Sequence, residues 1–318
     1  MTLRLAILGY GFIADLHARA ARECGLAISV VAGHRRASAA TFADQHGALR
    51  STDDWVEAVT ASDVDVVVVG TPNALHHPQT MAAIAAGKHV LVEKPMAVTP
   101  DDAHEMAAAA RERGLTLLVG HMWRYRDEVT AVRDRIAAGA VGRPVRTRGY
   151  GIHAGWGPRG WFVDPSLAGG GALIDMGIHA IDTARFVLGD PLPVRVVASL
   201  GTAHGDYHVD DDGIVLVDWS NGVRSVVECG WWQPKLDGVE ADTEIYGTEG
   251  YERIWPQYTA TSPPAPDYVH CTLPMYAAQM ADFVACCESG ATPRASAEVG
   301  CVALDIVAAA YASAASTR

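Results

Sequence analysis

The residues of this sequence that could do acid–base chemistry fall in two short segments. Lys94 lies at the centre of the run from Glu93 to Pro95, directly after an apolar stretch. Asp175, His179 and Asp182 are spaced by four and three residues, which would place them on one stripe of an α-helix. A histidine that titrates near neutral pH can take or give a proton, and an ammonium stabilises an alkoxide that forms beside it. The two segments could therefore transfer a proton and stabilise a developing negative charge.

Two glycine features lie within the second segment. Gly169 to Gly171 precede it and let another chain segment or a ligand approach closely. Gly177 removes a side chain between Asp175 and His179, where a substrate ring could lie. The alternatives are a solvated polar stripe without function or a zinc site. Zinc would need further ligands that the neighbouring sequence does not supply, so we expect no metal.

A glycine-rich turn near the N-terminus has the spacing of a dinucleotide-binding motif. The run Gly9-Tyr10-Gly11-Phe12-Ile13-Ala14 follows an apolar strand and opens a helix. In such a turn the first glycine permits the sharp bend, and the second lets the backbone approach a pyrophosphate at the helix N-terminus. We expect Gly9, Gly11, Phe12 and Ile13 to bind the cofactor. A plain structural turn is the alternative.

The end of the second predicted strand distinguishes the two nicotinamide cofactors. An acidic residue there binds the ribose 2′-hydroxyl of NAD, whereas an arginine accommodates the 2′-phosphate of NADP. No acidic residue occurs between Glu23 and Asp44, and the strand is followed by His34, Arg35 and Arg36. We therefore expect these three residues to favour NADP(H), with NAD(H) as the alternative cofactor. A solvated basic helix start is the other interpretation.

Short β-rich runs alternate with alanine-rich helical runs over the first 120 residues, which predicts a doubly wound parallel sheet with helices on both faces. Four consecutive valines at 66–69 are apolar on both faces, as a buried parallel strand requires. Lys94 would lie at the carboxyl edge of this sheet, where such sheets bind ligands. The predicted strands cover 3–8, 28–32, 64–69, 90–93 and 116–120, and the predicted helices cover 13–24, 37–46, 74–86 and 101–113.

The pattern changes after about residue 121. Several strand-like runs follow one another without intervening helices, and Asn221-Gly222 is a hairpin signal. This predicts an α+β half with a large, mostly antiparallel, open sheet. We place an NAD(P)-binding Rossmann domain at 1–121 and a substrate-binding and oligomerisation domain at 122–318. The predicted strands of this half cover 145–151, 194–202, 213–219, 224–232, 243–247 and 251–255, and its predicted helices cover 127–138, 172–188, 276–288 and 297–314.

Composition argues against several kinds of partner. The chain is 49% hydrophobic and 19% charged, as globular proteins are, and its net charge of −12 disfavours nucleic acid and anionic membranes. No run approaches the roughly 20 apolar residues of a membrane span, and the N-terminal apolar run breaks into glycines rather than a cleavage site. Six cysteines without a CxxC pair predict neither disulfides nor zinc. We expect a cytoplasmic protein, and a homodimer or homotetramer because an open sheet needs a covering partner.

These motifs resemble the Gfo/Idh/MocA family, the group that includes glucose–fructose oxidoreductase and inositol dehydrogenases. The resemblance runs nearly end to end. The matching segments are the turn at 9–14, Gly70-Thr71-Pro72-Asn73 with His76, Glu93 to Pro95, Gly120-His121 with Arg124-Tyr125, Gly160-Trp161 with the glycine triplet, Asp175 to Asp182, and Ala309 to Ser313.

The resemblance implies a role for each matching residue. Lys94 would lie beside the nicotinamide and hydrogen-bond the reacting oxygen. His179 would be the general acid and base, and Asp175 would bind substrate or orient the histidine. Trp161 would join Lys94, Asp175 and His179 in contacting the substrate, and the Lys94–Pro95 peptide would be cis. The residues expected along the cofactor are Thr71, Pro72, Asn73 and His76, with Glu93 and Lys94 near the nicotinamide ribose.

The sequence departs from the family at one position of the substrate segment. Phe162 follows Trp161 where relatives often have arginine, so a polar contact assigned to that position is not expected here.

The expected function is an NAD(P)-dependent oxidoreductase that interconverts an alcohol and a ketone, or a hemiacetal and a lactone, on a sugar, a polyol or a related cyclic substrate. An NAD-dependent glycosidase that uses transient oxidation and a non-catalytic NADP-binding sensor are the alternatives. An aromatic wall for a sugar could come from Tyr150, His153, Trp156, Trp161, Trp231 and Trp232, although most aromatics at strand spacing belong to a core.

Overall fold

The computed structural model describes residues 3–153, 159–231, 239–255 and 271–316. Contacts divide the chain into two compact units, Met1–Met122 with Leu273–Cys301, and Trp123–Thr272 with Val302–Arg318. The division into domains at 1–121 and 122–318 stays a prediction. The predicted boundaries assign residues 273–301 to the second domain, whereas contacts place them in the first unit.

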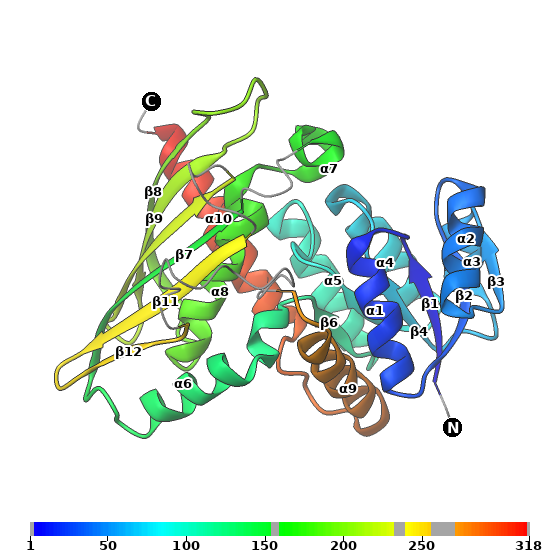
Figure 1. Ribbon diagram of the computed structural model, residues 1–318, viewed down its shortest axis with the longest axis horizontal. Coiled ribbons are helices and arrows are strands. Elements are labelled where there is room, and N and C mark those ends of the chain that lie inside the picture. Colours follow the sequence, from blue (N-terminus) through cyan, green and yellow to red (C-terminus); the bar gives the residue numbers. More distant parts are fainter. Residues whose placement is uncertain (1–2, 154–158, 232–238, 256–270, 317–318) are drawn as a thin grey trace, which may run out of the picture. The chain divides into compact units, whose positions relative to one another are not determined.

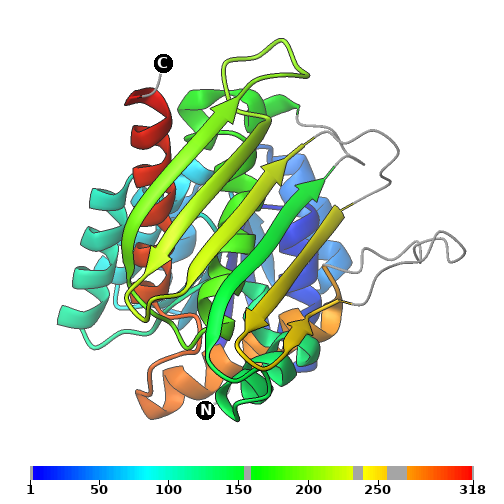
Figure 2. The same cartoon turned by 90° about the vertical axis from the view of Figure 1, so that its left-hand side faces the viewer.

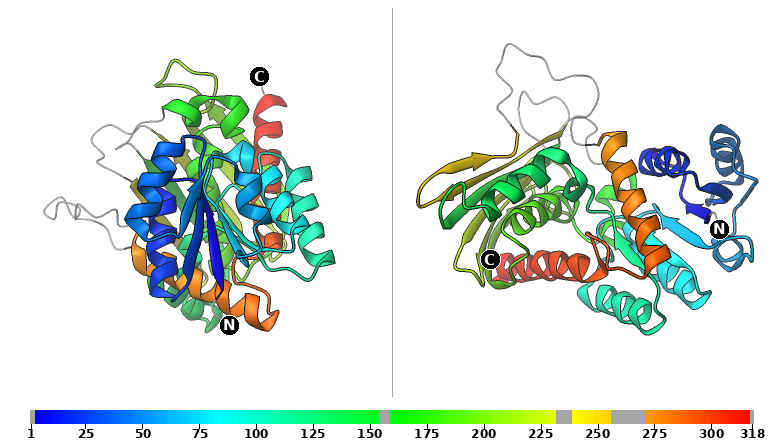
Figure 3. Two further views of the ribbon diagram at one scale, coloured as in Figure 1. Left: turned by 90° about the vertical axis from the view of Figure 1, so that its right-hand side faces the viewer. Right: turned by 90° about the horizontal axis from the view of Figure 1, so that it is seen from below.

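The first unit is built on a six-stranded parallel sheet in the order β3-β2-β1-β4-β5-β6, as predicted. Helices lie on both of its sides (Figure 3, left). The four valines of β4 are fully buried, which explains the uninterrupted apolar run. The strands are β1 (Arg4–Leu8), β2 (Ala27–Ala32), β3 (Arg50–Thr52), β4 (Val66–Val69), β5 (His89–Val92) and β6 (Leu117–Val119).

Local capping explains where several helices of this unit begin and end. The Asp54 side chain accepts the Val56 and Glu57 N–H groups to start α3, and Thr99 with Pro100 starts α5. Both β3 and α3 are too short to give a periodic signal, and the sequence did not predict them. The helices are α1 (Phe12–Glu23), α2 (Arg36–His46), α3 (Trp55–Thr60), the 3₁₀ turn Asn73–Leu75, α4 (His76–Ala85), α5 (Pro100–Glu112) and α9 (Leu273–Ser289).

The helix α9 completes the first unit although it comes late in the chain. It packs against α1 (Figure 1), where the Cys24 thiol contacts the Ala277 carbonyl oxygen. The segment after α9 then runs beside β6, since the Val119 N–H donates to the Ala295 carbonyl oxygen at 2.8 Å.

The second unit is built on a six-stranded sheet in the order β12-β11-β7-β10-β9-β8. Its neighbours are antiparallel except β7 and β10, which confirms the predicted mostly antiparallel sheet. Figure 2 shows the sheet face on, and none of the described helices covers the face turned to the viewer. The strands are β7 (Pro144–His153), β8 (Pro193–Gly201), β9 (Asp212–Trp219), β10 (Arg224–Gly230), β11 (Val239–Gly247) and β12 (Tyr251–Arg253).

The other face of this sheet packs against α8, which contacts β7, β10 and β11. Asn221-Gly222 forms the predicted hairpin turn, closed by the Trp219 N–H donating to the Val223 carbonyl oxygen. The helical segments of the unit are α6 (Asp127–Ala137), the 3₁₀ turn Gly160–Val163, α7 (Pro165–Ala168), a π-helix (Leu173–Gly177) and α8 (Ile178–Val187), and the 3₁₀ turn Met122–Tyr125 joins the two units.

The last helix, α10 (Ala297–Ser316), is long and apolar enough by length and composition to cross a membrane. The prediction that no run approaches that length is therefore wrong for this helix. A core helix has the same signature, and α10 makes specific contacts within the second unit. Its Tyr311 hydroxyl donates to Asp210, and its Ser313 hydroxyl accepts the Ala198 N–H.

Candidate active site

The glycine-rich turn has the geometry of a phosphate cradle. Gly9 has φ +109°, and a Cβ there would lie 2.5 Å from the Gly70 carbonyl oxygen, so no larger residue fits. Gly11 precedes α1, and a Cβ at Gly11 would meet none of the described atoms within 4 Å. Phe12, the first residue of α1, is 47% exposed. The backbone is therefore open where a pyrophosphate would approach a helix N-terminus.

The residues after β2 form a basic surface. His34, Arg35 and Arg36 are all exposed, and none of the described residues in the first turn of α2 is acidic. The Tyr10 hydroxyl lies 3.0 Å from His34 Nδ1, and the two rings stack. The NADP preference expected from these residues stays a prediction.

His76 joins the loop after β4 to the loop after β5. Its ring is buried, with Nδ1 2.7 Å from the Pro95 carbonyl oxygen and Nε2 2.8 Å from the Thr71 carbonyl oxygen. Burial lowers the pKa of His76, and the two carbonyl acceptors oppose that shift. Its place along the cofactor stays a prediction, as do those of Thr71, Pro72 and Asn73. Of these, Thr71 donates its hydroxyl to Gln79 Oε1 at 2.7 Å.

Lys94 follows β5 at the carboxyl edge of the parallel sheet, and its peptide bond to Pro95 is cis as expected. The preceding Glu93 is buried, with Oε1 2.7 Å from His17 Nε2 and Oε2 accepting the Lys94 N–H at 3.1 Å. The Tyr276 and His17 rings pack in a T-shaped arrangement. Glu93 thus anchors the backbone of Lys94. No sequence signal pointed to His17, which is 76 residues away.

The electrostatics of Glu93 follow from these contacts. Burial raises the pKa of a carboxyl group, but the His17 hydrogen bond and the charges of His17 and Lys94 outweigh that effect. The pKa of Glu93 is therefore lowered, and the group stays an anion beside the Lys94 backbone.

In the second unit, the glycine triplet admits two parts of the chain itself. A Cβ at Gly171 would lie 1.8 Å from the Asp210 carbonyl oxygen, and one at Gly170 would lie 2.2 Å from the Tyr311 hydroxyl. The Asp210 carboxylate accepts the Gly171 and Leu173 N–H groups at 2.9 and 2.8 Å, and the Tyr311 hydroxyl at 2.8 Å. Asp210 therefore caps the helical segment that carries Asp175 and His179.

That segment is not the continuous α-helix that the sequence predicted. Residues Leu173–Gly177 form a π-helix before α8 begins at Ile178, so the assumed α-helical stripe through Asp175 is wrong. Asp175, His179 and Asp182 are all at least nine-tenths buried, which excludes a solvated stripe. A Cβ at Gly177 would lie 2.8 Å from Leu173 Cδ1 and 3.0 Å from Cys229 Cβ. Gly177 thus packs on β10 instead of leaving room for a substrate ring.

Each of the three polar side chains has a defined partner. Trp231 Nε1 donates to Asp175 Oδ2 at 2.9 Å, and the Trp123 ring lies 4.7 Å from the His179 ring, centroid to centroid. Asp182 accepts bonds from Nε and a terminal amino group of Arg124, which also bonds Asp190. Burial lowers the pKa of Arg124, but Asp182 and Asp190 raise it by more than burial lowers it. The pKa of Arg124 is therefore raised, and the ion pair stays charged. Asp182 is therefore structural.

The remaining predicted residues of this half are placed as follows. The Trp161 and Phe162 rings stack 4.0 Å apart in the 3₁₀ turn Gly160–Val163. Trp161 and Tyr150 are partly exposed, and Trp231 is buried. Trp156, Trp232 and the side chain of His153 lie outside the described part of the chain.

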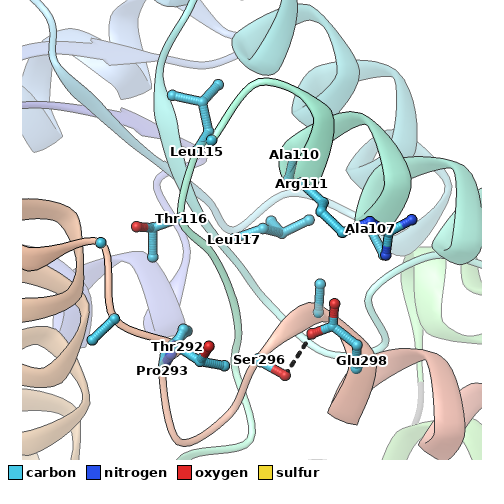
Figure 4. Close-up of a pocket in the computed structure, with 14 residues that line it drawn as sticks. Ala107, Ala110, Arg111, Leu115, Thr116, Leu117, Thr292, Pro293, Ser296 and Glu298 are labelled. Carbon is cyan, nitrogen blue, oxygen red and sulfur yellow. Dashed lines mark hydrogen bonds between the residues drawn. The ribbon is translucent and has the colours of Figure 1, made fainter.

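Two further features of the first unit lie apart from these residues. His77, Asp102 and Glu105 bring three possible ligand atoms within 4.8 Å of one another, and His77 Nε2 already bonds Glu105 at 2.9 Å. Figure 4 shows a pocket of about 300 Å³ at the amino end of β6, opposite the carboxyl edge that bears Lys94. Its polar lining comes from Arg111, Thr116, Thr292, Ser296 and Glu298.

Comparison with known proteins assigns the chain to a family. Residues 3–121 match the oxidoreductase family with an NAD-binding Rossmann fold, and residues 129–252 match the GFO/IDH/MocA C-terminal domain. The rhizopine catabolism protein MocA of Rhizobium meliloti is 32% identical over 319 residues, which cover 96% of this chain and 93% of that protein. The chain belongs to the Gfo/Idh/MocA family.

Other members of the Gfo/Idh/MocA family are similar over part or all of the chain. The 1,5-anhydro-D-fructose reductase of Ensifer adhaerens is 40% identical over 66% of this chain, and the match spans only 63% of that relative's length. A levoglucosan dehydrogenase solved with NADH and levoglucosan has a TM-score of 0.88 at 25% identity, covering 100% of this chain and 98% of that one. These matches confirm the resemblance drawn from the motifs.

The contact of Gly171 with Asp210 predicts a severe effect of one methyl group. Gly171→Ala should lower the free energy of unfolding by about 3 kcal/mol, because the helix start or Asp210 must move. Gly201→Ala is the matched control, since a Cβ there meets none of the described atoms within 4 Å, and it should change stability by less than about 1 kcal/mol. Urea unfolding followed by circular dichroism measures both. Equal small effects would contradict the close contact.

The lowered pKa of Glu93 predicts how stability depends on pH. The ionised carboxylate stabilises the fold above the ordinary value of 4.5, and this contribution is lost as pH falls through the lower folded pKa. Stability should therefore fall less steeply below about pH 4.5 in Glu93→Gln than in the wild type. Unfolding in urea at decreasing pH tests this, with the exposed Glu112→Gln as control. Parallel curves for wild type and Glu93→Gln would refute it.

Proposed function

We propose that this chain is an NAD(P)-dependent oxidoreductase that interconverts an alcohol and a ketone, or a hemiacetal and a lactone, on a sugar, a polyol or a related cyclic compound. The observation that carries the proposal is the pairing, in one family member, of an open phosphate cradle at Gly9–Gly11 with Lys94 at the carboxyl edge of the same sheet. The names of the similar proteins, a 1,5-anhydro-D-fructose reductase and a levoglucosan dehydrogenase, support the substrate class.

The proton chemistry is assigned to Lys94 and His179. A bound nicotinamide cofactor accepts or donates the hydride. The Lys94 ammonium donates a hydrogen bond to the reacting oxygen and stabilises its alkoxide character. In the oxidation, His179 takes the proton of the substrate hydroxyl, and in the reduction it returns a proton to that oxygen. Asp175 orients His179 or holds a substrate hydroxyl, and Trp161 contributes a ring face to the substrate.

NADP(H) is the cofactor that the residues after β2 favour. The exposed guanidinium groups of Arg35 and Arg36 can pair with a 2′-phosphate, and the first turn of α2 offers no carboxylate to a ribose 2′-hydroxyl among its described residues. The similar levoglucosan dehydrogenase was solved with NADH, so the preference for NADP(H) proposed here rests on the residues after β2 of this chain and not on that relative.

The open sheet face of the second unit supports a homodimer or homotetramer. Ile214 and Leu216 of β9 are 50% and 47% exposed on it, although they lie mid-strand. Arg195 and Arg224 flank Asp218 at 3.8 and 3.7 Å. An apolar centre with charges of both signs around it is self-complementary, as a twofold interface requires.

The assignment of Lys94 is tested by a pair of lysine variants at the two ends of β5. Lys94→Ala should abolish turnover and leave NADP(H) binding intact, because it removes the group on the reacting oxygen. Lys88→Ala, at the amino end of the strand, removes only bonds to the Ala61 and Val64 carbonyl oxygens and should retain turnover. The assay is cofactor absorbance with a panel of sugars, polyols and keto-sugars, with NADP and NAD side by side. Surviving turnover in Lys94→Ala would end its assigned role.

The cofactor preference is tested by removing both guanidinium groups. The double variant Arg35→Ala, Arg36→Ala should lower kcat/KM for NADP about tenfold or more and leave that for NAD nearly unchanged. Arg22→Ala, an exposed arginine at the end of α1, is the control and should change neither value. A wild type that prefers NAD would overturn the assignment.

The oligomer is tested by light scattering at micromolar concentration. The wild type should have the mass of a dimer or tetramer, and Leu216→Arg should shift it toward the monomer, because a charge would be buried at the apolar centre. Leu49→Arg changes an exposed leucine of the first unit and should leave the mass unchanged. A monomeric wild type would contradict the proposal.

A further inference from the structure

The indole of Trp231 makes a buried hydrogen bond to a side chain of the proposed catalytic set. Trp231 directly follows β10 and is fully buried, and its Nε1 donates to Asp175 Oδ2 at 2.9 Å. An indole N–H can only donate, so this bond favours the ionised form of Asp175 and fixes which oxygen faces the ring. Nothing in the sequence pattern pairs these two residues, which are 56 positions apart.

Asp211 holds Trp231 in place both directly and through Tyr207. The Trp231 backbone N–H donates to the Asp211 carbonyl oxygen at 3.0 Å. The Tyr207 and Trp231 rings pack in a T-shaped arrangement at 5.9 Å, centroid to centroid, and the Tyr207 hydroxyl donates to Asp211 Oδ2 at 2.9 Å. The backbone of Trp231 is therefore bonded to Asp211, and its ring packs against a tyrosine that is bonded to the same aspartate.

The Asp211 carboxylate also folds the loop that presents Tyr207. It accepts the backbone N–H groups of Ala203, His204 and Gly205 at 2.7 to 2.9 Å, and it is fully buried. Burial raises the pKa of Asp211, but these hydrogen bonds outweigh that effect and the pKa is lowered. The carboxylate stays ionised and can accept all of these backbone hydrogen bonds, which hold the loop in its fold.

We propose that Trp231 is a positioning residue of the active site, which, held by Tyr207 and the loop around Asp211, fixes the orientation of Asp175. This inference rests on the proposed function, since it acts through Asp175. Asp210, the residue before Asp211, caps the start of the segment that carries Asp175. Two consecutive aspartates thus fix both partners of one hydrogen bond, the helix on one side and the indole on the other.

A conservative variant with a matched control separates positioning from packing. Trp231→Phe removes the N–H donor and keeps an aromatic ring. Trp219→Phe makes the same change at another buried tryptophan of this sheet, whose Nε1 donates to Ser225 Oγ at 2.7 Å. Both variants should bind NADP(H) and lose similar stability.

Only Trp231→Phe should alter the chemistry. Its kcat/KM for the sugar-like substrate should fall about tenfold or more, because the Asp175 carboxylate loses the bond that fixes its orientation. Trp219→Phe should keep the wild-type kcat/KM. Should Trp231→Phe fold poorly, Tyr207→Phe, a change at a partly exposed residue, should lower kcat/KM by a smaller factor.

A double-mutant cycle identifies the route of the effect. In an Asp175→Ala background, Trp231→Phe should cause little further loss of kcat/KM, whereas Trp219→Phe should remain neutral. Equal losses of kcat/KM in Trp231→Phe and Trp219→Phe, or full additivity with Asp175→Ala, would overturn the inference while the function stands. If the wild type reduces or oxidises no compound of the panel, the proposed function fails and the inference falls with it.

Discussion

Buried charge that must be compensated is the constraint on which the predicted site residues of both units depend. Glu93 is an anion next to Lys94, and the His17 hydrogen bond from α1 and the charge of Lys94 both stabilise it. Asp182 is compensated by Arg124 and Asp211 mainly by backbone N–H groups, whereas burial raises the pKa of Asp210 despite its hydrogen bonds. Each compensation draws a second element to a fixed place, because an unpaired buried carboxylate would be far less stable.

Local signals allowed much of the fold to be predicted. The valines of β4, the turn at Gly9 and the Asn221-Gly222 hairpin each depend on neighbouring residues, so the sequence displays them directly. The pairing of Glu93 with His17 joins residues 76 positions apart, and that of Asp175 with Trp231 joins residues 56 apart. Neither pair has a periodicity, so no pattern could reveal it. The glycine triplet showed that something approaches closely, but the sequence did not say that it was Asp210.

The π-helix at Leu173–Gly177 explains why spacing misled at the second polar segment. A π turn holds more residues than an α turn, so the side chains before it are rotated relative to those of α8. Asp175 therefore meets Trp231, directly after β10, whereas Asp182 meets Arg124. Two carboxylates that an ideal helix would place on one stripe are given separate environments, one in the proposed chemistry and one in an ion pair.

The late return of α9 to α1 bears on the order in which the protein is made. During synthesis α1 leaves the ribosome well before the helix that covers it, which comes about 250 residues later, as the contact of Cys24 with Ala277 shows. The growing chain must wait with one side of its first unit uncovered while the whole second sheet is synthesised. Contacts of such long sequence separation fold slowly, and apolar surface that stays exposed meanwhile is prone to aggregate. The first unit can therefore complete its folding only after nearly all of this chain has been synthesised.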